Sequence, residues 1–423
     1  MQTGLFVPAR TFRLTASLNS SDSNRRWWLC GLLFVATALS FLDRQVLSVL
    51  APAITEQLGM SNVQYSHVTT AFLISYAVMF VVGGRWMDVL GTRLGMALSV
   101  GLWSLASAAH AAVQNAFQLG CWRFLLGVGE GGCFPGAAKG VAEWFPQRER
   151  ALAMGIAIGG ASLGAVVAPP LTVWLAKLVG WRGAFLTTGL MGAAWVAGWW
   201  LLSRGATATK EGSATVERPS LLSLLRRGDV WALALMRFIF DPVFYFYMFW
   251  IPKYLHQERG VSQQAIGDLV WIPFLALGIS NAVGGWVSDR LIRRGLPALT
   301  ARKTIMGAAA LVTIASSLAG QVRTVPMALA MMSLLMFAHG FWITNYVTLI
   351  SDRFPKNAVG TVMGFAGTVG AVGGILANTS TGWVVDKFSY GPLWLASGVM
   401  YPLAFLVLLL TIRGAGRHNE ASA

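Results

Sequence analysis

Apolar runs of about 20 residues recur along the whole of this 423-residue chain. A helix of about 20 residues crosses a hydrocarbon layer about 30 Å thick. Inside that layer a helix satisfies its own backbone hydrogen bonds, which irregular chain cannot do. Hydrophobic residues make up 55% of the sequence and charged residues 12%, a balance too apolar for a soluble domain. The sequence therefore predicts an all-α integral membrane protein.

The apolar runs fall into two groups of six, which predicts twelve transmembrane helices. The expected spans are residues 28–51, 66–87, 95–113, 117–140, 151–173, 182–202, 229–255, 265–287, 303–320, 325–350, 359–384 and 391–412. The expected parts are an N-terminal arm (1–26), a six-helix bundle (27–202), a linker (203–228), a second six-helix bundle (229–413) and a tail (414–423).

Basic residues collect on one expected side of the membrane. Loops that stay in the cytoplasm are enriched in Lys and Arg, and the arm, the linker, the loop after the eighth span and the tail are all arginine-rich. Both termini are therefore expected in the cytoplasm, with the arm disordered. The net charge of +15 follows from this topology and from attraction to an anionic leaflet, so it gives no reason to expect nucleic-acid binding.

Two short motifs occur once in each half of the chain. "EWFPQRERALAMG" (143–155) aligns without gaps on "DRFPKNAVGTVMG" (352–364), at an offset of 209 residues, and "GGRWMD" (83–88) matches "GGWVSD" (284–289). Two matches at nearly half the chain length predict a duplicated six-helix unit, an arrangement known among transporters. The second pair of matches shares the pattern Gly-x-x-x-Asp. A third copy of this pattern, from Gly382 to Asp386, is interpreted as coincidental.

The loop "GGRWMDVLGTR" resembles the signature between the second and third helices of the major facilitator superfamily. The residues that carry the match are Gly84, Asp88, Gly91 and Arg93. Small glycines let helix ends approach closely, and the Asp carboxylate can accept bonds from a helix N-terminus or an Arg. The loop is expected to act as a conformational latch, weakened here because Val89 replaces a usual Arg. Asp289 and Arg290 are the corresponding pair in the second half.

Six ionisable residues fall within the expected spans. They are Asp43, Arg44, Arg123, Glu130, Arg237 and Asp241. Such a residue costs about 2.5–3.5 kcal/mol at the bilayer centre on insertion scales, so those that persist are expected to be paired and to line a polar cavity.

The spacing of these six residues along the sequence predicts which of them can pair with each other. Adjacent residues on a helix point about 100° apart, so Asp43 and Arg44 are expected to serve different partners. Arg123 and Glu130 are seven residues apart and lie on one helix stripe. Arg237 and Asp241, at i and i+4, can bond directly. A purely structural ion pair is the simpler alternative for this last pair.

The three acids and three arginines sum to zero charge, so one added substrate carboxylate leaves the cavity at minus one. Desolvation and nearby negative charge both favour the protonated form of a carboxyl group. Asp43 or Glu130 is therefore expected to take up a proton, while Arg44 or Arg123 holds the carboxylate, because a guanidinium grips it bidentately. The sequence thus predicts symport of an organic anion with protons.

Four further polar residues are expected to contact the substrate, namely Tyr76, Tyr245, Asn345 and Asn378. Packing between helices is the alternative for each of them. The three cysteines fit no zinc or redox spacing, and neither a metal nor a cofactor is expected.

Three stretches carry a more specific resemblance, "FLDRQVLSVLAP", "RFLLGVGEGGCFPGAAKGVAEWFPQRERALAMG" and "RFIFDPVFYFYMFWIPKYLHQERG". They are similar to the anion:cation symporters of the major facilitator superfamily, and among these to hexuronate transporters. The resemblance implies that Asp43 and Glu130 are protonation sites, that Arg44 and Arg123 lie in the substrate cavity, and that Tyr76 is a cavity tyrosine.

The seventh helix refines the expected substrate. Aldonate transporters carry Gln and Asn where this chain has Arg237 and Asp241, which favours a differently oxidised sugar acid. By this resemblance the chain is expected to import glucuronate or galacturonate by alternating access, as a monomer in the bacterial inner membrane. The alternatives are another organic anion (an aldonate, an aromatic acid or a dicarboxylic acid) and, less favoured, an exporter. An enzyme is not expected, because the loops contain no metal-ligand spacing, nucleophile elbow or phosphate-binding loop.

Overall fold

The computed structural model describes residues 20–204 and 221–412, which form helices and short connections without a strand among them. The N-terminal half contains α1 (Ser20–Val49), α2 (Ala51–Gln57), α3 (Asn62–Ala109), η1 (His110–Ala112), α4 (Ala116–Glu130), α5 (Cys133–Trp144) and α6 (Gln147–Leu202). The C-terminal half contains α7 (Leu221–Leu225), α8 (Gly228–Gln257), α9 (Gln263–Leu269), α10 (Trp271–Arg293), α11 (Ala298–Thr313), η3 (Ile314–Leu318), α12 (Val325–Arg353), α13 (Lys356–Phe388) and α14 (Gly391–Thr411). The all-α expectation is confirmed.

Two glycines divide the longest helices. Gly91 in α3 has φ of 74° and Gly180 in α6 has φ of 71°, a backbone region that side chains with a Cβ rarely adopt. At each of them the chain turns, so α3 carries the expected second and third spans, and α6 carries the fifth and sixth.

The helices of the described residues account for the expected spans. Nine of them are long and apolar enough to cross a membrane, and one of these, 152–202, is long enough for two spans. The remaining expected spans, 66–87 and 117–140, lie on the first half of α3 and on α4 with α5. The α4–α5 pair is interrupted at Gly131 and Gly132, so neither piece reaches a full span length alone.

Some expected boundaries differ from the described helices. α1 begins at Ser20, inside the segment expected to be a disordered arm, and α7 lies within the expected linker. Residues 1–19, 205–220 and 413–423, which hold most of the expected arm, linker and tail, lie outside the described residues.

Close backbone packing joins the helices of the N-terminal half. A Cβ added at Gly160 or Gly164 of α6 would collide with the backbone carbonyls of Phe34 and Ala38 on α1. A Cβ at Gly127 of α4 would collide with Ser75 and Phe72 of α3. Small residues are what allow helices to approach this closely in a membrane. They hold α1 and α4, which carry the candidate site, against their neighbours.

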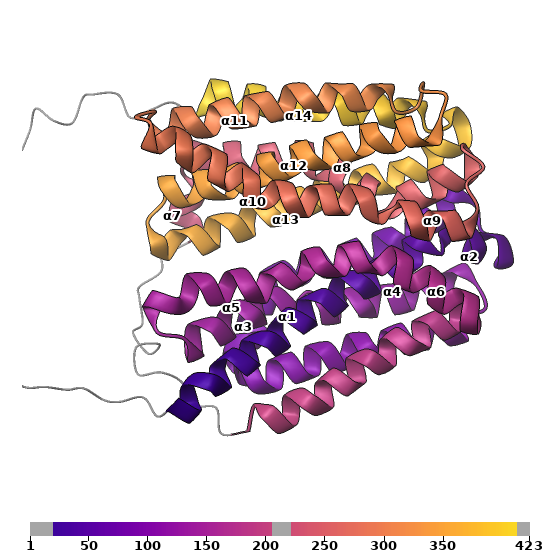
Figure 1. Ribbon diagram of the computed structural model, residues 1–423, viewed down its shortest axis with the longest axis horizontal. Coiled ribbons are helices and arrows are strands. Elements are labelled where there is room, and N and C mark those ends of the chain that lie inside the picture. The colour runs from indigo at the N-terminus through magenta and orange to yellow at the C-terminus, as the bar shows by residue number, and fades with distance from the viewer. Residues whose placement is uncertain (1–19, 205–220, 413–423) are drawn as a thin grey trace, which may run out of the picture.

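The two halves form separate groups of helices that meet at one end, where α2 and α9 lie (Figure 1). We call this the closed end and define it by residues 49–70, 249–263 and 378–386. Hydrogen bonds cross between the halves here. Tyr65 donates to the Phe249 carbonyl at 2.7 Å, Gln263 to the Val49 carbonyl at 2.7 Å, and Asn62 to Asp386 at 2.6 Å.

At the opposite end, which carries the Gly91 turn, the described ion pairs join residues of the same half. They include Lys139 with Asp88, Arg302 with Asp289 and with Asp352, and Arg353 with Asp229. We call this the latch end. The pattern of cross-half bonds is therefore asymmetric along the long axis of the helices.

Candidate functional site

Arg44 and Glu130 form a buried ion pair between α1 and α4. The Nε and Nη2 atoms of Arg44 donate to Oε2 of Glu130 at 3.1 and 2.9 Å, and the Ser40 hydroxyl donates to the same oxygen at 3.1 Å. The two charged side chains are 4% and 0% exposed. Three donors thus converge on one carboxylate oxygen, while Oε1 has no partner in the described part of the chain.

Aromatic rings enclose the guanidinium of Arg44. Its central carbon lies 4.7 Å from the ring centroid of Phe41, 5.1 Å from that of Phe72 and 4.5 Å from that of Tyr76. Phe72 and Tyr76 are at i and i+4 on α3 and stack at 5.5 Å. The faces of these rings attract a cation, so they stabilise Arg44 in addition to its ion pair with Glu130.

The C-terminal half contributes a second ion pair, on α8. Nε and Nη2 of Arg237 both lie 2.8 Å from Oδ2 of Asp241, the direct bond that the i, i+4 spacing predicts. One turn further on, Tyr245 stacks on Phe249 at 6.2 Å. Tyr245 interacts electrostatically with Tyr76 and Arg44 of the other half. The structure therefore brings together six of the predicted residues, which we call the central cluster, consisting of Arg44, Tyr76, Glu130, Arg237, Asp241 and Tyr245.

Asp43 and Arg123 are buried inside the N-terminal half. Oδ1 of Asp43 accepts a hydrogen bond from Ser107 at 2.8 Å, which confirms that Asp43 and Arg44 serve different partners. Arg123 is 1% exposed and its guanidinium lies 5.9 Å from the ring centroid of Phe185. Asp43 and Arg123 thus lie in the same half as Arg44 and Glu130, and Arg123 interacts electrostatically with the other three of these residues.

The two asparagines have structural partners. Asn345 donates to the Phe341 carbonyl at 2.8 Å and to the Gly284 carbonyl at 3.4 Å, which packs α12 against α10. Asn378 belongs to the closed end, where its amide nitrogen donates to the carbonyl of Ser66 and to the hydroxyls of Thr69 and Thr70 at 2.8–3.1 Å.

The latch loop of the N-terminal half is built differently from the expectation. Asp88 pairs with Lys139 at 3.2 Å, where an Arg or a helix N-terminus was expected. The close glycine contact belongs to Gly83, whose added Cβ would lie 3.0 Å from the Gly131 carbonyl, whereas a Cβ at Gly84 would meet open space. Gly84 thus makes no close contact in this conformation, and its packing role stays a prediction.

The remaining latch residues also bond within their own half. Arg93 donates to Ser203 and to the Trp200 carbonyl, both at 3.1 Å. In the C-terminal half Asp289 pairs with Arg302 at 3.3 Å, and Arg290 lies over the Trp286 ring at 5.4 Å. Whether these loops act as a latch stays a prediction.

Sequence reasoning missed several residues that complete the site. Ser40, Phe41 and Phe72 touch Glu130 or Arg44, and each lies three or four residues from a predicted member of the cluster. Helical spacing therefore contained the signal, because residues at i+3 and i+4 share a face.

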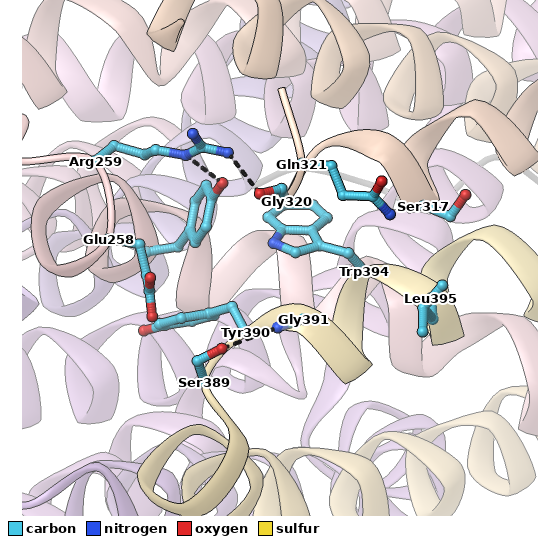
Figure 2. Close-up of a pocket in the computed structure, with 11 residues that line it drawn as sticks. Glu258, Arg259, Ser317, Gly320, Gln321, Ser389, Tyr390, Gly391, Trp394 and Leu395 are labelled. Carbon is cyan, nitrogen blue, oxygen red and sulfur yellow. Dashed lines mark hydrogen bonds between the residues drawn. The ribbon is translucent and has the colours of Figure 1, made fainter. Parts of the chain in front are cut away.

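A cavity of about 280 Å³ lies in the C-terminal half, between α8, η3 and α14, away from the predicted residues. Figure 2 shows Arg259 on one side of it, with Trp394, Tyr390 and Ser389 on the others. Arg259 already donates to Tyr254 and to the carbonyls of Ala319 and Val322 at 2.6–2.8 Å. These bonds give Arg259 a structural role at the end of α8. Within the described residues no group of three or more His, Cys, Asp or Glu side chains is arranged to hold a metal ion.

Comparison with known proteins agrees with this architecture. The hexuronate transporter of Escherichia coli K12 is 29% identical over 402 residues, covering 90% of this chain and 93% of the relative. The galacturonate transporter of Dickeya chrysanthemi is 32% identical over 281 residues, covering 62% and 81%. These relatives confirm the resemblance predicted from the sequence motifs.

Solved structures share the fold. A bacterial homologue of the human lysosomal transporter Spinster, solved in an inward-facing and unoccupied conformation, has a TM-score of 0.73 at 19% identity and covers 92% of this chain and 95% of its own. The model of the Major Facilitator Superfamily matches residues 33–378. The chain is therefore a multi-pass membrane transporter, not an enzyme, and belongs to the Major Facilitator Superfamily.

Proposed function

We propose that the chain is a proton-coupled symporter that imports a sugar-acid anion, with a hexuronate as the substrate class that fits best. The observation that carries this proposal is the Arg44–Glu130 pair, a guanidinium inside an aromatic enclosure whose anionic partner is itself a titratable group. The names of the hexuronate and galacturonate transporters among its relatives support the substrate class.

The pair links substrate binding to protonation, because the substrate carboxylate and the Glu130 carboxylate compete for the same N–H groups of Arg44. A substrate carboxylate that takes the two N–H groups of Arg44 now bonded to Glu130 Oε2 displaces Glu130. A buried carboxylate that loses its partner carries a high desolvation cost, so displacement is favourable when Glu130 takes up a proton at the same time. Substrate binding and proton binding then depend on each other, which is the requirement for symport.

The C-terminal half suits the rest of a sugar acid. The Asp241 carboxylate can accept hydrogen bonds from hydroxyl groups, and the Tyr245 ring offers an apolar face. Because Asp241 is held by Arg237 at 2.8 Å, its acceptor oxygens have a fixed direction. A polyhydroxylated anion would thus place its carboxylate on the N-terminal half and its hydroxyls on the C-terminal half.

Alternating access supplies the transport step. The distribution of Lys and Arg favours cytoplasmic termini, so the closed end would face the periplasm and the latch end the cytoplasm of a bacterial inner membrane. In the proposed cycle, the hydrogen bonds of the closed end break as the two halves rock about the central cluster. The conformation described here would then be closed to the outside.

The test is uptake by purified protein in liposomes. Labelled glucuronate, galacturonate and galactonate are offered with and without an inward proton gradient, and a pH-sensitive dye inside the vesicles follows proton entry. We expect the gradient to drive accumulation of a hexuronate above its external concentration, with dye acidification that depends on substrate. Accumulation that is the same with and without the gradient would overturn proton coupling. A preference for galactonate would identify aldonates as the substrate class.

A further inference from the structure

A second group of buried polar side chains in the N-terminal half is not used by the exchange at Glu130. Its members are Asp43, Trp103, His110 and Arg123, each at most 1% exposed. Arg123 interacts electrostatically with Asp43 and with His110, and Trp103 interacts with Asp43. The four side chains, from α1, α3, η1 and α4, therefore face one buried region.

Several polar atoms of this region have no hydrogen-bond partner among the described residues. They are Nε2 of His110, which is an acceptor, and Nε and Nη2 of Arg123, which are donors. Nε1 of Trp103 is directed at Asp43. An unsatisfied buried polar atom costs about 1–3 kcal/mol, and buried water is the usual partner of such atoms. Water both donates and accepts, so it suits this mixture. A lone anion would be repelled by Asp43, and a lone cation by Arg123.

The hydrogen bond at Nδ1 fixes how His110 presents its ring. Nδ1 lies 2.6 Å from the carbonyl of Ala106. Because a carbonyl only accepts, Nδ1 carries a hydrogen, which leaves Nε2 of the neutral ring as an acceptor. The ring stacks on Phe185 at 4.7 Å and is held in place. His110 therefore lies near Arg123, whose guanidinium faces the same Phe185 ring at 5.9 Å.

His110 lies on the closed-end side of the N-terminal half, because α3 starts at Asn62 in the closed end, turns at Gly91 and runs back to Ala109. His110 follows the last residue of α3, and the connection to α4 begins after η1 at Val113. One turn before His110, Ser107 donates to Asp43. The charged group that interacts with the His110 ring is Arg123 of α4. Arg123 in turn interacts with Glu130 of α4 and with Asp43 and Arg44 of α1.

We propose that His110, together with ordered water, relays protons between the closed end and Asp43. This inference rests on the proposed proton coupling. Nε2 takes a proton from water on the closed-end side and forms an imidazolium. After the water hydrogen bonds rearrange, the same N–H bond breaks and the proton passes through water to Oδ2 of Asp43.

Two substitutions separate a relay from a structural role. In His110→Asn the amide nitrogen takes the place of Nδ1 and can keep the bond to Ala106, while nothing replaces Nε2. In His110→Gln the amide reaches the position of Nε2 and can hydrogen-bond there, but it cannot carry a proton. His339→Asn is the matched control, because His339 is a buried histidine of the other half that bonds Tyr401 through Nδ1 at 2.5 Å.

Each variant is reconstituted as the full chain and assayed in two ways, by proton-driven uptake with an internal pH dye and by exchange of internal for external hexuronate. We expect both His110 variants to slow driven uptake and dye acidification at least tenfold, with exchange and melting temperature close to those of the unaltered protein. The His339 variant should change both assays in parallel. Recovery of driven uptake in His110→Gln, or equal loss of exchange and driven uptake, would overturn the relay. If the unaltered protein moves substrate without acidifying the dye, the proposed proton coupling fails instead.

Discussion

Arg44 donates two hydrogen bonds to a single oxygen of Glu130, Oε2, at 3.1 and 2.9 Å, and the second carboxylate oxygen has no partner among the described residues. A guanidinium that is held by one oxygen can be released by one event, the neutralisation of that carboxylate. The variants below test how far transport depends on this pair and on the helices around it.

Glu130→Gln is expected to uncouple transport from the proton gradient. Glutamine keeps an oxygen that can accept from Arg44 but cannot release a proton, so gradient-driven accumulation should fall at least tenfold. Exchange of internal for external substrate should persist, because Arg44 is still available to the substrate. Proteoliposome uptake and exchange measure the two quantities. Glu143→Gln, an acid at the latch end with 29% side-chain exposure, is the control and should leave both unchanged. Full gradient-driven accumulation in Glu130→Gln would remove Glu130 from proton coupling.

Arg44→Lys is expected to weaken substrate binding at least tenfold. An ammonium cannot present the two N–H groups of a guanidinium fork to a carboxylate, and it interacts less well with the flat faces of Phe41, Phe72 and Tyr76. Binding can be measured by isothermal titration of the purified protein with glucuronate. Arg26→Lys changes an ion pair with Glu149 at 2.8 Å outside the central cluster and serves as the comparison. Unaltered affinity in Arg44→Lys would place the substrate elsewhere.

The double variant Arg237→Gln, Asp241→Asn is expected to shift selectivity from a hexuronate towards an aldonate. Both residues are replaced by neutral amides, so no buried charge is left unpaired. Asp241→Asn alone leaves the buried charge of Arg237 without its partner and should impair transport more severely. We expect the ratio of galacturonate to galactonate uptake to fall about tenfold in the double variant. Competition between the two labelled substrates gives this ratio. An unchanged ratio would mean that Arg237 and Asp241 of α8 do not determine which substrate is selected.

Asn378→Ala is expected to loosen the closed end. The substitution removes the amide that bonds Ser66, Thr69 and Thr70 across the two halves, and each lost bond is worth about 1 kcal/mol. A cysteine introduced by Phe72→Cys, at a site 1% exposed, should react about tenfold faster with a membrane-impermeant thiol reagent when Asn378 is alanine. The exposed Cys121 is first replaced by serine. Asn345→Ala removes amide bonds within one half and should not change the rate, so equal acceleration by both would show general loosening.

Gly160→Ala is expected to destabilise the N-terminal half, because its Cβ would collide with the Phe34 carbonyl on α1. Overpacking of this kind costs about 1–3 kcal/mol. Its neighbour Gly159 has open space at the Cβ position, so Gly159→Ala should be neutral or stabilising by up to about 1 kcal/mol through helix propensity. Melting temperatures in detergent compare the two variants. Equal melting temperatures would argue against the close approach of α1 and α6.

The amino-acid sequence by itself determined the fold class and the residues that carry charge inside the membrane. Spans of about 20 apolar residues leave a helix as the available structure, and the duplicated motifs predicted two equivalent halves. Helical periodicity also predicted local relationships, such as the Arg237–Asp241 bond at i, i+4 and the separation of Asp43 from Arg44. These follow from the geometry of one helix, which is local to the chain.

Only the tertiary structure decided which helix faces which. Glu130 pairs with Arg44, 86 residues away, while Arg123, seven residues from Glu130 on the same helix, is enclosed with His110 and Asp43. Asn378 joins the two halves at the closed end, and Asp386, whose motif was interpreted as coincidental, bonds Asn62 across the same boundary. Helix periodicity gives the face of a residue but not the helix packed against it. That choice depends on close contacts at glycines such as Gly127 and Gly160, whose partners lie far away in the sequence.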